Sequence, residues 1–204
     1  MAYVGVVGPS DASADEIEAA YSLGRALGAR GHVVVCGGLG GVMAAVSRGA
    51  AEAGGVVFGI LPGSDPADAN PHVTVAFPTG LGELRNGLLV RSSEVVVSIG
   101  GSWGTLSEVA LAVRTGVPVL ALRGWDLPPG PEPVSSVAEV LERLDALLAS
   151  GPKTSTADGP ATGFATGGAD GPPSGPQTGS ADGPQIGDAE GPPSGPAAGG
   201  PGRA

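Results

Sequence analysis

Short runs of β-branched and other apolar residues alternate along the first 150 positions with longer Ala-rich stretches, in which apolar residues recur every three or four positions. The apolar runs predict six strands, at Tyr3–Val7, Val33–Cys36, Val56–Leu61, Val73–Phe77, Val95–Ile99 and Val117–Leu122. The Ala-rich stretches predict helices at 14–30, 41–53, 81–93, 105–115 and 137–149. Several of the strand runs are apolar at every position, as expected where helices cover both faces of a parallel sheet. This alternation predicts an α/β fold, a Rossmann-like doubly wound parallel sheet of about six strands with helices on both faces.

Polar residues at the helix boundaries support the same elements. A Ser or Thr followed three residues later by Glu, the capping-box pattern, occurs at Ser13 and Glu16, at Thr105 and Glu108, and at Ser136 and Glu139. The last predicted helix places its large apolar residues on one face, and Gly151 follows as a stop signal.

Composition divides the chain at about residue 150. Gly and Pro together make up 25 of the 54 residues 151–204, and Phe164 and Ile186 are the only large apolar side chains there. Burial on that scale does not offset a backbone ordering cost of roughly 1–2 kcal/mol per residue. We therefore predict a folded domain over residues 1–150 and a disordered, acidic Gly/Pro-rich tail over residues 151–204.

Charge and cysteine content narrow the possible partners. The net charge is −10, and the first 150 residues carry 8 Arg and no Lys against 15 acids, with no basic run, so nucleic acid is not expected as a partner. The single cysteine, Cys36, cannot form an internal disulfide. The first apolar run lacks a basic flank and is too short for a signal peptide or a membrane span. We expect a soluble cytoplasmic protein with no membrane partner.

Glycine marks the position after five of the predicted strands, at the sheet edge where ligands bind in open α/β folds. The residues in the three most informative loops are Gly8 and Ser10; Gly38, Gly40 and Gly41; and Gly101, Ser102, Gly104 and Thr105. The second and third of these loops run into helices, whose N-terminal amides each favour an anion by about 0.3–1 kcal/mol. The loops therefore predict a phosphate-binding crevice, and residues 1–150 are expected to form a Rossmann-like nucleotide- or phosphate-binding domain.

Other nucleotide sites and metal sites lack their required parts. Neither of the first two glycine loops completes G-x-G-x-x-G, and no acid follows the second predicted strand, so a dinucleotide is disfavoured. A P-loop needs a lysine, and the chain has only Lys153, in the tail. The two histidines, His32 and His72, are isolated from each other, which disfavours a metal site or a Ser-His triad. We expect no metal and no bound cofactor.

Three polar residues are the best candidates for contacts beside the glycine loops. The guanidinium of Arg85 could fork onto a phosphate, and the neighbouring Asn86 could donate or accept a hydrogen bond. Alternatively, Arg85 is a surface residue paired with Glu83. Glu108 could face a sugar, because a carboxylate repels a phosphate, or it could serve only in the capping box. Trp103 could cover a base or fill a loop, and the sequence leaves both open.

Taken together, these motifs resemble the lonely-guy superfamily of Rossmann proteins over about Tyr3 to Ala149. The resemblance is carried by the segments 37–43, 49–55, 59–62 and 100–108. Members of the enzyme branch are cytokinin riboside 5′-monophosphate phosphoribohydrolases, which cleave an N-glycosidic bond without a metal or cofactor. Their motif P-G-G-x-G-T-x-x-E aligns with 100–108, which begins with Gly100 in place of proline, has Ser102 for the second glycine and keeps Glu108. The resemblance also implies a homodimer or homotetramer.

One departure from the enzyme branch affects the expected function. An Arg-Lys pair of that branch aligns with Arg85 and Asn86, so the lysine is absent here. The Arg-Asn pair is more similar to a sister group of small nucleotide-binding proteins that includes the molybdenum cofactor carrier proteins. We therefore rank binding of a phosphorylated, nucleotide-like or molybdopterin-type small molecule first. Phosphoribohydrolase activity, with Arg85 and Glu108 as the catalytic pair, ranks second.

Overall fold

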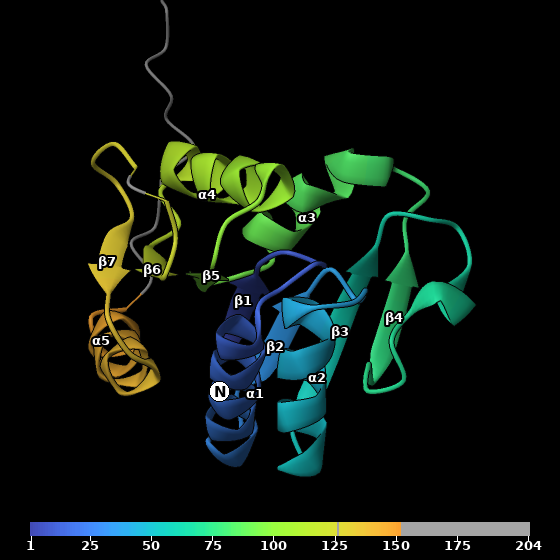
Figure 1. Cartoon of the computed structure of the whole chain (residues 1–204), viewed down its shortest axis with the longest axis horizontal. Helices are drawn as coiled ribbons and strands as arrows, with labels where there is room; N and C mark the ends of the chain where they lie inside the picture. The colour runs from blue at the N-terminus through green and yellow to red at the C-terminus, as the bar shows by residue number, and fades with distance from the viewer. Residues whose placement is uncertain (126, 152–204) are drawn as a thin grey trace, which may run out of the picture. The chain divides into compact units, whose positions relative to one another are not determined.

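The computed structural model describes residues 1–125 and 127–151, and the predicted tail from 152 onward lies outside the described residues. Seven parallel strands form one sheet in the order β4-β3-β2-β1-β5-β6-β7 (Figure 1). The strands are β1 (Tyr3–Val7), β2 (Val33–Cys36), β3 (Val56–Leu61), β4 (Val75–Pro78), β5 (Val95–Ile99), β6 (Val119–Leu122) and β7 (Glu132–Val134). The predicted α/β, Rossmann-like class is confirmed.

Helices cover both faces of this sheet. They are α1 (Ala14–Ala29), α2 (Val42–Glu52), α3 (Asn86–Arg91), α4 (Trp103–Thr115) and α5 (Val137–Ala149), with short 3-10 turns η1 (Pro66–Asp68) and η2 (Gly82–Arg85). The helices α1, α2 and α5 pack on one face, and α3 and α4 pack on the other (Figure 1). Alternate residues of the central strands feed the two cores: Val4 and Val6 of β1 face the first, and Val7 faces the second.

The main differences from the predicted elements lie after β4. The seventh strand, β7, was not predicted, because it is only three residues long and contains Pro133. Its Glu132 forms an ion pair with Arg143 of α5. The helix predicted at 81–93 is divided into η2 and α3, so Arg85 lies at the junction of the two segments.

The capping boxes have different outcomes. At α1 both halves of the box between Ser13 and Glu16 are present. At α4 the N-cap is Ser102, whose hydroxyl accepts from the Thr105 amide, so the box predicted between Thr105 and Glu108 is wrong. The helix begins two residues earlier than predicted, which leaves the Glu108 side chain without a capping role.

Close packing of α1 on α2 brings the loops after β1 and β2 together. A Cβ at Gly24 would overlap the carbonyl oxygen of Val46, so the absence of a side chain lets the two helices touch. At the end of α2 nearest the sheet edge, the Val42 amide donates to the Pro9 carbonyl at 3.1 Å. Gly41, with φ of 59°, fits against the Pro9 and Ser10 carbonyls, where a Cβ would collide.

Candidate functional site

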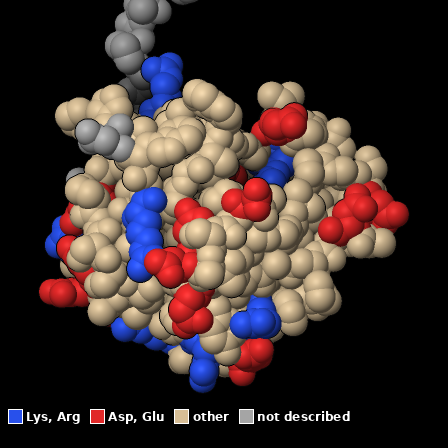
Figure 2. All heavy atoms as spheres, viewed as in Figure 1, with Lys and Arg blue, Asp and Glu red and all other residues tan. Residues whose placement is uncertain are grey.

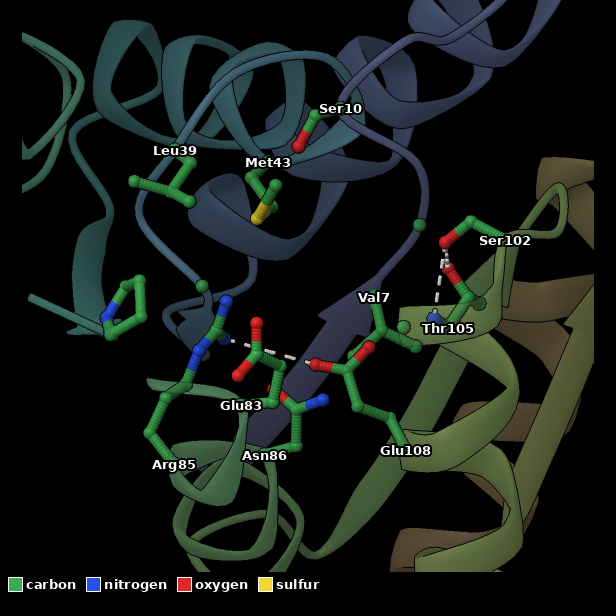
Figure 3. Close-up of a pocket in the computed structure, with 14 residues that line it drawn as sticks. Val7, Ser10, Leu39, Met43, Glu83, Arg85, Asn86, Ser102, Thr105 and Glu108 are labelled. Atoms are coloured by element: carbon green, nitrogen blue, oxygen red, sulfur yellow. Dashed lines mark hydrogen bonds and ion pairs between the residues drawn. The ribbon is translucent and has the colours of Figure 1, made fainter. Parts of the chain in front are cut away.

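A cavity of about 190 Å³ opens at the carboxyl edge of the sheet, where β1 and β5 are neighbours (Figure 3). The strand order runs in opposite directions from this point, which makes it the topological switch point where ligands bind in open α/β sheets. The lining residues come from the end of β1 and from the loops and helix starts that follow β1 to β5. They are Val7, Gly8, Ser10, Gly37, Leu39, Met43, Pro62, Glu83, Arg85, Asn86, Ser102, Gly104, Thr105 and Glu108.

Most of the residues predicted for the site line this cavity. The predicted residues that the structure brings together there are Gly8, Ser10, Arg85, Asn86, Ser102, Gly104, Thr105 and Glu108. Gly38, Gly40, Gly41 and Gly101 are not among the lining residues. Gly38 faces Leu61, Gly41 packs beneath the loop after β1, and Gly101 faces the Trp125 indole, so these three have local roles.

Several lining residues were not among the predicted site residues. Gly37 and Pro62 begin two of the loops that the glycine pattern had marked. Because these loops follow parallel strands of one sheet, their first residues lie at the same sheet edge as the predicted site. Glu83 was considered only as a surface partner for Arg85. Leu39 and Met43 lie in the segment 37–43 that carries the family resemblance, but they were not singled out, because an apolar side chain near a helix start looks the same in a core and in a cavity wall.

Arg85 provides the cationic group of the cavity. The residue is 8% exposed, and its Nε and Nη1 atoms are buried without a hydrogen-bond partner. Its ion pair is with Glu108, with 3.8 Å between Nη1 and Oε1 (Figure 3), rather than with Glu83. A Cβ at Gly37 would overlap this guanidinium, so the missing side chain provides the space that Arg85 occupies. An unsatisfied buried guanidinium is costly, which points to a partner outside the protein.

Glu108 is the buried acid of the cavity. The residue is 6% exposed, and burial raises the pKa of its carboxyl to about 7, against an opposing effect of Arg85. Burial also raises the pKa of the nearby Cys36 thiol, which contacts the Ser47 hydroxyl at 3.5 Å. Glu108 is therefore able to gain or lose a proton close to neutral pH, whereas Cys36 stays a neutral thiol.

Hydrogen bonds fix three of the remaining polar side chains of the cavity, those of Asn86, Ser102 and Thr105. The Asn86 side-chain amide donates to the Ser107 hydroxyl at 2.9 Å, and that hydroxyl donates to the Gly104 carbonyl at 2.7 Å. This chain ties α3 to the first turn of α4. The Ser102 and Thr105 hydroxyls lie 2.9 Å apart and share a hydrogen bond. The loop after β5 is thereby held in a defined shape at the cavity wall.

Trp103 and His32 do not line the cavity. Trp103 is 81% exposed and packs edge-on against Trp125, with 5.5 Å between ring centroids. The His32 Nδ1 accepts from the Ala2 amide at 3.2 Å, which is a structural contact. Within the described part of the chain, no three His, Cys, Asp or Glu residues gather in a way that could hold a metal ion.

The fold and the cavity together define a Rossmann-like protein with one buried cation at the switch point of its sheet. A model of the SLOG cluster4 family matches residues 1–151. The chain therefore belongs to the SLOG cluster4 family, which agrees with the resemblance found in the sequence.

Known proteins similar to this chain include two solved structures and one curated sequence. The molybdenum cofactor binding protein from Rippkaea orientalis is 35% identical, with a TM-score of 0.69 over 72% of this chain and 97% of that one. The molybdenum cofactor carrier protein from Chlamydomonas reinhardtii is 32% identical, with a TM-score of 0.68 over 72% of this chain and 98% of that one. An uncharacterized protein from Archaeoglobus fulgidus is 38% identical over 59% of this chain and 79% of its own length.

Proposed function

We propose that this protein binds a phosphorylated pterin-type small molecule, or a related nucleotide, at the switch-point cavity and carries it without chemical change. The observation that carries the proposal is the Arg85 guanidinium, which is buried at the cavity with two nitrogen atoms lacking hydrogen-bond partners. A phosphate oxygen is the partner that such a group binds best, because charge-assisted hydrogen bonds are the strongest kind. The similarity to two proteins named for binding or carrying the molybdenum cofactor supports a pterin as the rest of the ligand.

Different residues of the cavity would contact different parts of the ligand. Arg85 supplies the charge, and the first turn of α4 supplies backbone amides and the hydroxyls of Ser102 and Thr105. Gly8 and Gly104 let main chain approach the ligand without a Cβ in the way. Leu39 and Met43 offer an apolar wall to a flat ring (Figure 3).

Titration calorimetry with ribose 5-phosphate, AMP and molybdopterin tests this proposal. We expect saturable binding of the phosphorylated compounds and a loss of about 10- to 100-fold in Arg85→Gln, since a hydrogen bond to a charged group contributes about 1.5–3 kcal/mol. Arg91→Gln is the matched control, because this exposed arginine ends α3, the helix that directly follows Arg85, but does not line the cavity. Equal affinity in wild type and Arg85→Gln would contradict the proposal, as would binding of unphosphorylated nucleosides alone.

Phosphoribohydrolase activity is the second candidate. The observation that favours it is Glu108, a buried acid whose pKa is raised by burial to about 7, near the optimum for general acid-base catalysis. In this case Glu108 would orient water or stabilise an oxocarbenium-like sugar while Arg85 holds the phosphate. Incubation with AMP and with an isoprenylated adenosine monophosphate, followed by chromatography of free base, tests the activity. If wild type releases base no faster than Glu108→Gln does, the protein is not a phosphoribohydrolase that uses Glu108.

A second copy of the chain is the partner that the surface favours. Exposed leucines lie along η2, α3 and α4, at Leu81, Leu84, Leu88 and Leu111. Leu84 is 80% exposed, so burial against a symmetry mate would remove a large apolar area from water. We propose a homodimer or homotetramer built on this face. Light scattering after gel filtration should show a larger species for wild type than for Leu84→Asp, and a monomeric wild type would refute the assembly.

The proposed partners do not include nucleic acid or a membrane. On the face shown in Figure 2, basic side chains are separated by acidic and uncharged ones and form no continuous patch. Within residues 1–125 and 127–151, no helix is both long and apolar enough to cross a bilayer. A location in the cytoplasm stays part of the proposal, and cell fractionation would test it.

A further inference from the structure

The ion pair between Arg85 and Glu108 is incomplete. Nη1 and Oε1 are 3.8 Å apart, whereas a charge-assisted hydrogen bond usually closes to about 2.7–2.9 Å. Nε and Nη1 of Arg85 have no hydrogen-bond partner. Among the described residues, the contact found for the Glu108 carboxyl is this ion pair alone. Both side chains are more than nine-tenths buried and both line the cavity. The pair therefore attracts without satisfying either member, which leaves hydrogen-bonding capacity for a third group.

A phosphate in this place would meet opposite influences from the two side chains. Arg85 attracts it, while an ionised Glu108 repels it and competes for the same guanidinium. The surroundings strengthen this conflict, because burial limits the screening by water. Glu108 in its neutral form removes the repulsion and gains an O–H that can donate to a phosphate oxygen.

We propose that Glu108 contacts the ligand as a neutral acid, donating a hydrogen bond to a phosphate oxygen that also accepts from Arg85, so that binding takes up a proton wherever Glu108 is ionised in the free protein. The inference rests on the proposed phosphate-binding function and gives Glu108 a role that requires no hydrolysis. The proton comes from solvent, stays on the Glu108 carboxyl while the ligand is bound and returns to solvent on release. No covalent bond forms or breaks.

The other charged and titratable groups around Glu108 are compatible with this proton uptake. Arg85, from η2, is the cation that favours the ionised carboxyl, and a phosphate paired with Arg85 would cancel that influence. Glu83, also from η2, adds an exposed negative charge at the same cavity (Figure 3). Cys36, at the end of β2, stays neutral because burial raises its thiol pKa. Burial raises the pKa of Glu108 to about 7, so the neutral form is well populated before the ligand arrives.

Calorimetric titration with ribose 5-phosphate between pH 6 and pH 8 tests the proposal in three proteins. With the Glu108 pKa at about 7, the neutral fraction falls about tenfold over this range, and the wild-type affinity relative to Glu108→Gln should fall by the same factor. The amide of Glu108→Gln keeps a donor and does not titrate. Glu83→Gln is the matched control, because it removes an exposed carboxylate at the same cavity and should keep the wild-type pH dependence. Ionisation of the ligand phosphate is common to all three proteins and cancels in the ratio.

Proton uptake by wild type alone gives a second measurement that does not depend on the folding of a variant. At pH 8 the ligand phosphate, with a second pKa of about 6, is already ionised, so titrations in two buffers of different ionisation enthalpy should report uptake of nearly one proton. Uptake near zero at pH 8, or an identical pH dependence in wild type and Glu108→Gln, would overturn the proposal. The proposed function fails separately, if ribose 5-phosphate shows no saturable binding at pH 6 or binds Arg85→Gln equally well.

Discussion

Replacing Glu108 by Gln should change how the stability of the ligand-free protein depends on pH. Burial raises the pKa of Glu108 from 4.5 to about 7, so the folded protein holds this proton more tightly than the unfolded chain does. Between these two values the folded state binds more protons, and the free energy of unfolding must therefore fall as pH rises from about 4.5 to about 7. A shift of this size corresponds to about 3 kcal/mol, at 1.36 kcal/mol for each pH unit.

The assay is thermal or urea unfolding of wild type and Glu108→Gln at pH 5 and at pH 8. Gln resembles the protonated acid and does not titrate, so the variant should gain about 3 kcal/mol on wild type between pH 5 and pH 8. For a chain of this size, that gain moves the midpoint by about 6–12 °C. The difference between the two proteins removes the contribution of every other titrating group to the pH dependence of stability. One such group is Glu139, whose pKa is lowered by hydrogen bonds from Ser135. Parallel pH profiles for the two proteins would refute the claim that Glu108 is buried with a raised pKa.

Three further substitutions test particular contacts. Gly37→Ala should weaken ribose 5-phosphate binding by about 10- to 100-fold in calorimetry, because the new Cβ displaces the Arg85 guanidinium. In an Arg85→Ala background the same substitution should have no further effect on binding. Gly24→Ala should lower the free energy of unfolding by about 1–3 kcal/mol in urea titrations, because the Cβ would strike the Val46 carbonyl oxygen. Ala favours helix over Gly, so a stabilised variant would contradict this packing. Trp103→Ala should cost about 0.5–1.5 kcal/mol of stability through the lost Trp125 contact and leave ribose 5-phosphate binding unchanged, so weakened binding would place Trp103 in the site.

The sequence predicted the central sheet well because local and tertiary preferences agree there. The bounds of β1, β2, β3 and β5 match the predicted strands, since each is an apolar run that ends at glycine or proline. The short edge strand β7 was missed because only Val134 of its three residues is buried, which is too little to form a pattern. Leu84 of η2 and Leu88 of α3 recur at helical spacing but are exposed, so their periodicity could not reveal the break between the two segments.

The site was predictable only as far as it follows from topology. Parallel strands end at one edge, so glycine loops that follow them must converge, and the sequence shows those loops directly. The fit of the Arg85 guanidinium over Gly37 joins loops about fifty positions apart and leaves no sequence signal. For Glu108, the spacing to Thr105 also matched a capping box, and only the helix start at Trp103 decides between the two interpretations.

The position of Asn86 gives the strongest reason to rank binding above hydrolysis. In the lonely-guy enzymes that the sequence resembles, a lysine aligns here, which would give the cavity a second cation beside Arg85. In this protein the Asn86 amide donates to Ser107 and holds α3 against α4, so it is engaged in structure. The cavity then has one cation, Arg85, and two carboxyls, Glu83 and Glu108. In this balance an ionised Glu108 opposes an anion held by Arg85. An acid that must keep its proton to bind the phosphate is not free to act as a base toward water.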